Sequence, residues 1–434
     1  MAGYILALDQ GTTSSRAIIY DDRARPIQIS QKPTVLSTPK AGYVEQDAMQ
    51  IWHTQISCAH DAINQAGLLA TDITSLAITN QRETIVVWDK RTGKSLAPAI
   101  IWQDRRSEDW CQNLRQHKVE GSEMSMEQHV QSITGLRVDP YFSASKIVWL
   151  LENHPNLKDR AQRGEVAVGT IDSWLMFKLT GGEHVIDITN ASRTLMYDIN
   201  KLEWSEELLA KFDICKKILP KVIASDGDFG RTKKGLFAKQ IPIQAVLGDQ
   251  QAALFGQGCV STGMAKNTYG TGCFMLMNIG HEVQLSQHQL LTTIGWQRRH
   301  NNPQLLAGAT EHPSFSKLVK SGQRMLTPAK REVTYALEGS VFMAGAIVQW
   351  LRDNMGLFNK SRDIESLARE VESSEQVVLV PAFTGLGAPY WRSDITASIS
   401  GMTRGSTKAH IARAALESIA FQTYDVLTAM QKDS

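Results

Sequence analysis

The segment Tyr4-Ile-Leu-Ala-Leu-Asp-Gln-Gly-Thr-Thr-Ser-Ser-Arg-Ala-Ile-Ile-Tyr20 decides how the fold begins. Its two apolar runs, Tyr4–Leu8 and Arg16–Tyr20, have the composition of buried strands. The polar residues between them include a glycine and four hydroxyl side chains, which are typical of a turn. The segment therefore predicts a hairpin that opens a sheet.

Further strands and helices are predicted along the chain by the same criteria. The expected strands are Leu76–Thr79, Thr84–Trp88 and Gln244–Leu247. The expected helices are Ser145–Asn153, Trp204–Phe212, Gly339–Asp353 and Ala409–Met430. A mixture of strands and helices indicates an α/β layer architecture. A second Gly/Thr turn within Lys266–Asn278 also leads into an apolar strand, which favours either two related halves or a chance recurrence of such turns.

Composition places the chain among globular proteins and excludes several classes of partner. A length of 434 residues exceeds what one core supports, so two or three domains are expected. The net charge of +2 gives no electrostatic case for a nucleic acid or a membrane surface. No signal peptide and no apolar stretch of about 20 residues is present, so membrane insertion is not predicted. Five scattered cysteines without a C-x-x-C pair favour the reducing cytoplasm.

The turn of the first hairpin has the chemistry of a phosphate-binding loop. Gly11 lets the backbone approach an anion, and Arg16 adds positive charge. Hydroxyl donors come from Thr12, Thr13 and Ser14. Asp9 ends the first strand, where its carboxylate is suited to hold Mg²⁺ directly or through water. The alternative is an ordinary hairpin whose polar side chains satisfy turn amides.

Two acidic positions are candidates for chemistry on a hydroxylated substrate. Asp249 lies between a predicted strand and a predicted helix, where it fits either a helix N-cap or a general base toward a hydroxyl. Arg82 and Glu83 are adjacent at a strand–turn junction. They fit either a surface salt bridge or a complementary pair of ligands for neighbouring hydroxyls.

Three aromatic residues lie within or beside these polar motifs. Trp102, Tyr141 and Phe274 fit either the hydrophobic core or the walls of a polyol site. In the second interpretation the rings cover the C–H face of the substrate, and the Tyr141 hydroxyl binds one of its oxygens. A basic, aperiodic stretch at 297–331 is interpreted as an exposed insert, with an anion site as the alternative.

Seven segments in order along the chain resemble the FGGY carbohydrate kinases, and within that family the members that phosphorylate glycerol. The matching segments are Asp9–Arg16, Asn80–Thr84, Ile101–Arg106, Tyr141–Trp149, Gly248–Gln257, Asn267–Phe274 and Pro381–Trp391. A second family signature is similar to Ser398–Met402 and Ala409–Glu417. The matches cover nearly the whole chain apart from the basic stretch.

The resemblance implies the fold and the reaction. We expect two actin-like (ribonuclease H-like) ATPase domains, 1–256 and 257–434, flanking a catalytic cleft. ATP with Mg²⁺ binds on one side of the cleft and glycerol on the other. The implied reaction transfers the γ-phosphoryl group of ATP to glycerol and gives sn-glycerol 3-phosphate. A cytoplasmic homo-oligomer, dimer or tetramer, is also implied.

The resemblance also assigns roles to individual residues. It implies that Asp249 is the catalytic base. The implied glycerol site consists of Arg82, Glu83, Tyr141, Asp249 and Gln250, with Trp102 and Phe274 as apolar walls. The implied nucleotide site consists of Thr12, Thr13, Ser14, Arg16, Thr271, Gly345 and Gln349, with Asp9 for Mg²⁺.

The chain departs from the family pattern in three places. Family members continue past Ser434 into a strand and a Gly-Gly-Ala turn that holds the adenosine, so we expect an incomplete second domain and weakened ATP binding. The basic stretch 297–331 replaces a short connection. Thr232–Gln240 lacks the consecutive glycines with which some members bind fructose 1,6-bisphosphate.

Three other functions stay open on the sequence alone. The first is a kinase for another sugar or polyol such as xylulose, although Arg82-Glu83 with Trp102 and Gln250 favours a three-carbon substrate. The second is a nucleotide-dependent assembly protein of the actin-like superfamily, which needs the phosphate loops but not Asp249. The third is a catalytically impaired, truncated isoform.

Overall fold

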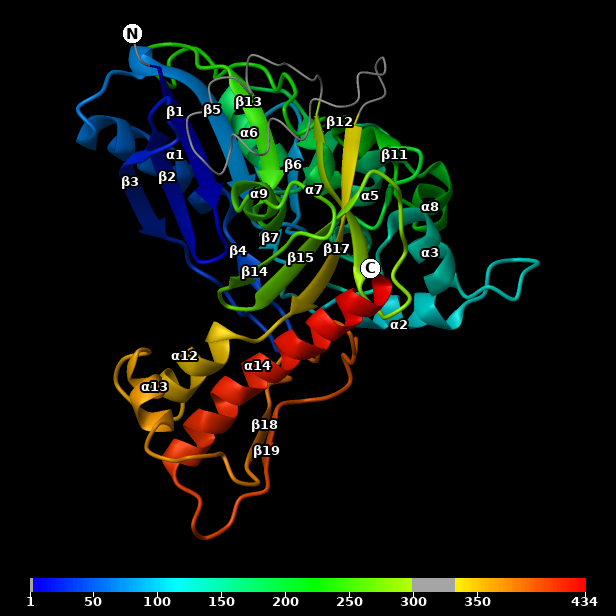
Figure 1. The fold of residues 1–434 in the computed structure, drawn as a ribbon. Coiled ribbons are helices and arrows are strands. Elements are labelled where there is room, and N and C mark those ends of the chain that lie inside the picture. Colours follow the sequence, from blue (N-terminus) through cyan, green and yellow to red (C-terminus); the bar gives the residue numbers. More distant parts are fainter. Residues whose placement is uncertain (1–2, 299–331) are drawn as a thin grey trace. The chain divides into compact units, whose positions relative to one another are not determined.

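A computed structural model describes residues 3–298 and 332–434, and it divides the chain into two compact units (Figure 1). The first unit consists of Met1–Gly258 and Thr293–Tyr335, and the second consists of Cys259–Thr292 and Ala336–Ser434. The predicted boundary at 256/257 lies two residues from the first change of unit. The return of the chain to the first unit at Thr293 was not predicted.

The first unit is built on a mixed five-stranded sheet with the order β13-β5-β1-β2-β3. Its strands are β1 (Tyr4–Gln10), β2 (Ser14–Tyr20), β3 (Pro26–Pro33), β5 (Ile73–Asn80) and β13 (Ile243–Gly248). The predicted hairpin is confirmed, because β1 and β2 pair antiparallel. Strand β5 runs parallel to both β1 and β13, so the carboxyl ends of these three strands meet at one edge. That edge is where α/β sheets place their ligands.

Helices α1 (Ala48–Gln65) and α6 (Ile171–Thr180) contribute to the core of this sheet. Helix α1 packs against β1, β2 and β3 (Figure 1). Its start is fixed by Asp47, whose carboxylate accepts from the backbone N–H groups of Met49 and Gln50. Trp174 of α6 is fully buried and donates its indole N–H to the Ala48 carbonyl at 2.8 Å. This contact joins the two helices at the level of the core.

Shorter elements complete the first unit. Its remaining strands are β4 (Glu45–Gln46), β6 (Val86–Asp89), β7 (Ala99–Ile100), β8 (Val166–Gly169), β9 (Val185–Asp187), β10 (Tyr197–Asp198), β11 (Glu203–Trp204) and β12 (Lys221–Ile223). They form the two-stranded pairs β4-β7, β6-β8, β9-β12 and β10-β11. Its remaining helices are α2 (Glu108–Gln116), α3 (Met126–Thr134), α4 (Ser143–Asn153), α5 (Leu157–Gln162), α7 (Ile188–Ala191), α8 (Glu206–Lys211) and α9 (Asp249–Gly256). Two 3-10 turns lie at Ala70–Asp72 and Lys216–Ile218.

The second unit contains a hairpin and three helices. The hairpin strands β14 (Ala265–Tyr269) and β15 (Cys273–Gly280) belong to a sheet with the order β14-β15-β17-β16. The division between the units falls within β16 (Leu291–Arg298) and β17 (Glu332–Val341). The helices are α12 (Gly345–Asp353), α13 (Asp363–Ala368) and α14 (Lys408–Asp433), and a small pair of strands is β18 (Val378–Val380) and β19 (Ser398–Ser400). An apolar face of α14 packs on α12, α13 and β18.

The predicted strands and helices are present, but three of them begin later than predicted. Strand β6 begins at Val86 and not at Thr84. Trp204 belongs to β11, and α8 begins only after Ser205, whose hydroxyl accepts from the Leu208 N–H as a helix cap. The predicted helix Gly339–Asp353 begins instead at Gly345, because β17 continues to Val341. The apolar spacing that predicted the longer helix comes from a fully buried strand followed by an amphipathic helix.

The predicted insert 297–331 falls outside the described residues except for its first two positions. Gln297 and Arg298 are the last residues of β16, so the first two residues of the predicted insert belong to a strand. Among the described residues, no helix is long and apolar enough to cross a membrane.

We expect Gly339→Ala to destabilise the second unit. A Cβ atom added at Gly339 of β17 would lie 2.1 Å from Cγ1 of Val426, whose buried side chain on α14 has little freedom to move. Overpacking of this kind costs about 1–3 kcal/mol of unfolding free energy, measurable by urea denaturation. Gly405→Ala is the control, since its Cβ meets only the Thr403 hydroxyl at 3.7 Å. Equal stability of the two variants would contradict the predicted close packing.

Candidate functional site

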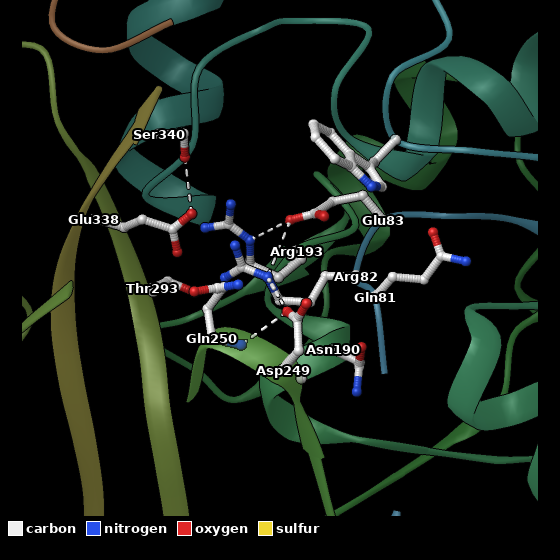
Figure 2. Close-up of polar contacts among 12 residues, drawn as sticks. Gln81, Arg82, Glu83, Asn190, Arg193, Asp249, Gln250, Thr293, Glu338 and Ser340 are labelled. Atoms are coloured by element: carbon white, nitrogen blue, oxygen red, sulfur yellow. Dashed lines mark hydrogen bonds and ion pairs between the residues drawn. The ribbon is translucent and has the colours of Figure 1, made fainter. Parts of the chain in front are cut away.

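The carboxyl ends of β1, β5 and β13 bring together residues that are far apart in the sequence. Gln10 of β1 pairs with Asn80 of β5, and Asn80 pairs with Gly248 of β13. The chain segments that follow Asn80 and Gly248 therefore leave the sheet side by side. Figure 2 shows the result, with Arg82, Glu83, Arg193 and Asp249 pointing toward one another.

Asp249 is the first residue of α9, and Gly248 is the helix cap. The N-cap role considered for Asp249 is therefore wrong by one residue. Its carboxylate accepts from the Gln250 N–H at 2.8 Å and lies 3.5 Å from Nε of Arg82. A third of the side chain remains exposed to solvent (34%). The carboxylate therefore lies in the first turn of a helix, beside a guanidinium, where solvent or a substrate is able to reach it.

Gly248 makes room for the Arg82 side chain. A Cβ atom at this position would lie 2.7 Å from Cδ of Arg82 and 2.9 Å from Oε1 of Gln251. Gly248 has ordinary backbone angles, so its role is the close approach of these side chains and not backbone freedom. Arg82 is thus held against the strand end that carries Asp249.

Arg82 and Glu83 are buried, so they are not a surface salt bridge. Their side chains are each 2% exposed, with Nε of Arg82 3.8 Å from Oε1 of Glu83. Arg82 donates to Oε1 of Gln251 at 3.2 Å and to the Tyr141 hydroxyl at 3.4 Å. Glu83 accepts from Nε of Arg193 at 2.7 Å. Glu83 also has φ = 61°, a strained angle for this residue type that persists only where the surroundings hold it, as at many functional sites.

The aromatic side chains Trp102 and Tyr141 lie against each other. Their ring centroids are 5.9 Å apart in an edge-to-face arrangement, and the Arg193 guanidinium is 5.7 Å from the Tyr141 ring. The loop that carries Tyr141 is fixed by Lys146, whose ammonium donates to three carbonyls, those of Pro140, Tyr141 and Phe142. Burial lowers the pKa of Lys146 to about 8. Trp102 and Tyr141 therefore border the same polar group as Arg82.

The turn of the first hairpin has polar groups of two kinds, some bonded to neighbouring side chains and some without an intramolecular partner in the described part of the chain. Thr12 accepts the Trp102 indole N–H on its hydroxyl at 2.9 Å, and its carbonyl accepts from Gln46 at 2.7 Å. Among the described residues, the backbone N–H groups of Thr12 and Thr13 have no acceptor. The Ser14 hydroxyl accepts from Gln31 at 3.0 Å. A turn with unbonded backbone N–H groups and hydroxyl side chains has the composition of an anion site.

Asp9 and Arg16 flank this turn as a cross-strand pair. Their side chains form an ion pair with 3.3 Å between Nη1 and Oδ2, and both remain partly exposed. Burial raises the pKa of Asp9, and the charge of Arg16 opposes that shift. Within residues 3–298 and 332–434, no three His, Cys, Asp or Glu side chains are grouped to hold a metal ion.

In the second unit, the Gly/Thr turn at 270–272 contacts the start of α12. Gly345 donates its N–H to the Gly270 carbonyl at 2.9 Å, and Ala344 and Ala346 donate to the Thr271 carbonyl. A Cβ atom at Gly345 would lie 2.5 Å from the Gly270 oxygen, so the contact requires glycine. Gln349 of α12 is exposed, and Phe274 of β15 is half-buried. The structure thus brings Thr271 and Gly345 together within this unit.

The sequence reasoning missed several residues that organise the first unit's site. They are Arg193, Gln251, Lys146, Asp187 and Asn190. Arg193 is fully buried within a run of mostly uncharged residues, and that isolated charge was the one signal available.

Asp187 joins two of the strand ends at the site. Its carboxylate accepts from the backbone and side chains of Thr189 and Asn190 and from the Ser225 hydroxyl. Asn190 in turn exchanges two hydrogen bonds with Asn80 at the end of β5, at 3.0 and 3.1 Å. The Thr189 hydroxyl accepts the N–H of Gly248 at 2.9 Å. Helix α7 thereby fixes the residues that precede both Arg82 and Asp249.

Family comparison identifies two adjoining regions. Residues 4–256 match the FGGY family of carbohydrate kinases, N-terminal domain, and residues 265–434 match the C-terminal domain of the same family. A glycerol kinase of Acinetobacter baylyi is 54% identical over 431 residues, covering 99% of this chain and 79% of the relative. A glycerol kinase of Deinococcus radiodurans is 51% identical, covering 99% of this chain and 78% of the relative.

Solved structures agree with this two-domain α/β fold. A glycerol kinase of Plasmodium falciparum with ADP has a TM-score of 0.81 and 34% identity, over 100% of this chain and 79% of that one. A ligand-bound xylulose kinase of Lactobacillus acidophilus has a TM-score of 0.78 at 20% identity, over 99% of this chain and 78% of that one. At 20% identity, the similarity to the xylulose kinase supports the fold and not the substrate.

We expect Asp172→Asn to weaken the pH dependence of stability. Burial and the nearby Asp187 raise the pKa of Asp172 to about 7, and burial raises the pKa of Asp187 to about 6. Both values exceed the unfolded value of about 3.9, so the folded chain holds extra protons between about pH 4 and 7. The stability that these groups contribute is full below about pH 4 and is lost as pH rises through about 6 to 7.

The measurement is the thermal midpoint across this pH range. The wild-type midpoint should fall as pH rises, and the fall should be smaller in Asp172→Asn, which keeps the shape of the side chain without its charge. Asp47→Asn, which preserves a helix cap, serves as the control. An unchanged pH slope in Asp172→Asn would refute the raised pKa.

Proposed function

The chain belongs to the FGGY family of carbohydrate kinases, and on that premise we propose that it transfers the γ-phosphoryl group of ATP to glycerol. The product is sn-glycerol 3-phosphate. Relatives that are 54% and 51% identical are named glycerol kinases. The observation that carries the proposal is the buried group Arg82, Glu83 and Tyr141 beside the partly exposed carboxylate of Asp249.

Each residue of that group has a role in binding the substrate. Arg82 supplies donors and Glu83 an acceptor for adjacent hydroxyls, and the Tyr141 hydroxyl serves either way. The side chain of Gln250, next to Asp249 in α9, adds an amide. Trp102 and Phe274 are proposed as apolar walls against the C–H faces of glycerol.

Asp249 is the proposed general base. A hydroxyl of glycerol bonded to its carboxylate transfers its proton there as the oxygen attacks the γ-phosphorus and the bond to the β-phosphate oxygen breaks. Nε of Arg82 lies 3.5 Å from this carboxylate and holds it in place. Phosphoryl transfer needs little covalent help, so positioning and charge neutralisation by the chain account for most of the catalysis.

The nucleotide phosphates are assigned to the Gly/Thr turns. Thr12, Thr13 and Ser14 offer backbone and hydroxyl donors, and Arg16 offers charge. Thr271 is the corresponding residue of the second turn. Gly345 acts by allowing close contact of α12 with that turn, since its N–H is already bonded. Exposed Gln349 on α12 completes the proposed nucleotide residues.

Asp9 is the proposed protein ligand of Mg²⁺. Mg²⁺ commonly takes one or two carboxylates together with substrate phosphates and water, which fits a lone carboxylate next to a phosphate-binding turn. Bound Mg²⁺ would neutralise charge on the phosphates. A cytoplasmic location and a homo-oligomeric state, dimer or tetramer, are further parts of the proposal carried over from the family.

The substrate assignment is tested by coupled detection of ADP release. The panel contains glycerol, xylulose and other pentoses, each with ATP and Mg²⁺. Glycerol is expected to give the highest kcat/KM. A higher value with a pentose would replace glycerol as the proposed substrate.

Asp249→Asn should abolish turnover while leaving glycerol affinity within about tenfold of wild type, because the amide retains the side-chain shape but cannot take up the proton. Turnover is followed by ADP release and affinity by titration calorimetry. Asp47→Asn is the matched control and should have wild-type turnover. Near-normal turnover of Asp249→Asn would place the base elsewhere.

Fructose 1,6-bisphosphate should neither bind tightly nor inhibit. The segment 232–240 contains one glycine, Gly235, and the N–H of Lys233 already donates to the Leu179 carbonyl at 2.7 Å. Consecutive glycines, which let the backbone form an anion cradle, do not occur in this segment. Titration calorimetry with the bisphosphate is the measurement. Micromolar binding that is lost in a Lys233→Ala, Lys234→Ala double variant would overturn the prediction.

A further inference from the structure

A buried pair of glutamine side chains, Gln46 and Gln81, links the phosphate turn to the segment that carries Arg82 and Glu83. The two residues are 2% and 1% exposed. Nε2 of Gln81 donates to Oε1 of Gln46 at 2.8 Å, which joins the amides end to end. Neither residue has a role in the proposed chemistry, although Gln81 directly precedes Arg82 and Glu83 in the chain (Figure 2).

One end of this bridge holds the phosphate turn at Thr12. Nε2 of Gln46 donates to the Thr12 carbonyl at 2.7 Å. Gln46 lies on β4, which pairs with Ala99 of β7, and the chain continues from β7 to Trp102. The Trp102 indole N–H binds the Thr12 hydroxyl at 2.9 Å. Thr12 is therefore held at its carbonyl and its hydroxyl by two adjacent pieces of chain.

The other end of the bridge holds the polyol segment. Oε1 of Gln81 accepts from the Thr84 hydroxyl at 3.1 Å, and the Thr84 N–H donates to the Arg82 carbonyl at 2.7 Å. These bonds close a short loop around Glu83, whose strained φ of 61° needs such support. A change in the position of Gln81 would therefore displace Arg82 and Glu83, the two proposed ligands of glycerol.

We propose that Gln46 is a positioning residue that couples nucleotide binding to polyol binding. The inference rests on the proposed function. A phosphate bound at the turn fixes Thr12, and the Gln46–Gln81 bridge then favours the arrangement of Arg82 and Glu83 that binds glycerol. Thermodynamic linkage requires the reverse effect as well, so that glycerol tightens nucleotide binding by the same factor.

A glutamine suits this position because it donates at one end and accepts at the other. Replacing Gln46 with an apolar side chain of similar length leaves the buried Nε2 of Gln81 without its acceptor and removes one donor from the Thr12 carbonyl. The Thr12 carbonyl keeps its second donor, the Thr34 hydroxyl at 3.0 Å. The turn is thus expected to survive the substitution while its connection to Gln81 is lost.

The experiment measures glycerol affinity by titration calorimetry with and without saturating adenylyl imidodiphosphate and Mg²⁺. In the wild type we expect the nucleotide analogue to tighten glycerol binding by roughly tenfold, within the range of typical couplings. In Gln46→Met this factor should fall to about twofold or less. Gln81→Met removes the other half of the bridge without touching Thr12, and it should give the same loss.

The double variant Gln46→Met, Gln81→Met should lose no more coupling than either single variant, because both act on one bridge. Gln55→Met is the matched control. Gln55 is also buried and donates to the backbone of the phosphate hairpin, at the Arg16 carbonyl (2.8 Å), but it does not contact Gln81. Its coupling factor should equal that of the wild type.

The outcomes separate this inference from the proposed function. Wild-type coupling in both Gln46→Met and Gln81→Met, or an equal loss in Gln55→Met, would overturn the role of Gln46. Absence of any coupling in a wild-type chain that phosphorylates glycerol would overturn it as well and leave the proposed function intact. A wild-type chain that neither binds nor phosphorylates glycerol would refute the proposed function and this inference with it.

Discussion

The hydrogen bonds accepted by Asp187 are the constraint on which the first unit's site depends. This one carboxylate holds helix α7, and α7 holds Asn80 through Asn190 and Gly248 through Thr189. The strands that end in those residues are parallel neighbours, so their backbones alone fix their spacing but not the direction of the chain beyond them. Hydrogen bonds at the strand ends set that direction for Arg82 and for Asp249.

The charged side chains at these ends are balanced in number. Arg82 and Arg193 face Glu83 and Asp249, and every one of them except Asp249 is nearly or fully buried. Burying charges costs free energy that their mutual attraction often fails to repay, so such a group is a poor device for stability. The arrangement fits the proposed binding role, because the buried members are fixed in place and the partly exposed carboxylate is the one that a ligand is able to reach.

The sequence predicted those features of the site that depend only on residues close together in the chain. The hairpin, the position of Asp249 after a strand and the turn chemistry of Gly11 to Ser14 follow from neighbouring residues. Arg193 and Asp187 did not emerge, because Arg193 is 110 residues from its partner Glu83 and Asp187 acts through a short helix whose sequence reads as a loop. The end of β17 was mistaken for helix for a related reason: a fully buried strand lacks the alternation that distinguishes strands.

The two Gly/Thr hairpins show how similar turns differ in chemistry. In the first, the cross-strand residues flanking the turn are Asp9 and Arg16, which are charged and partly exposed. In the second, the pair at the same distance from the turn is Thr268 and Phe274, which are uncharged, and the turn's carbonyls accept from the start of α12. Duplication of an ancestral hairpin, one of the two explanations considered for the recurring Gly/Thr turn, stays a hypothesis. The first turn is therefore flanked by a charged pair, whereas the second turn uses its carbonyls to anchor a helix.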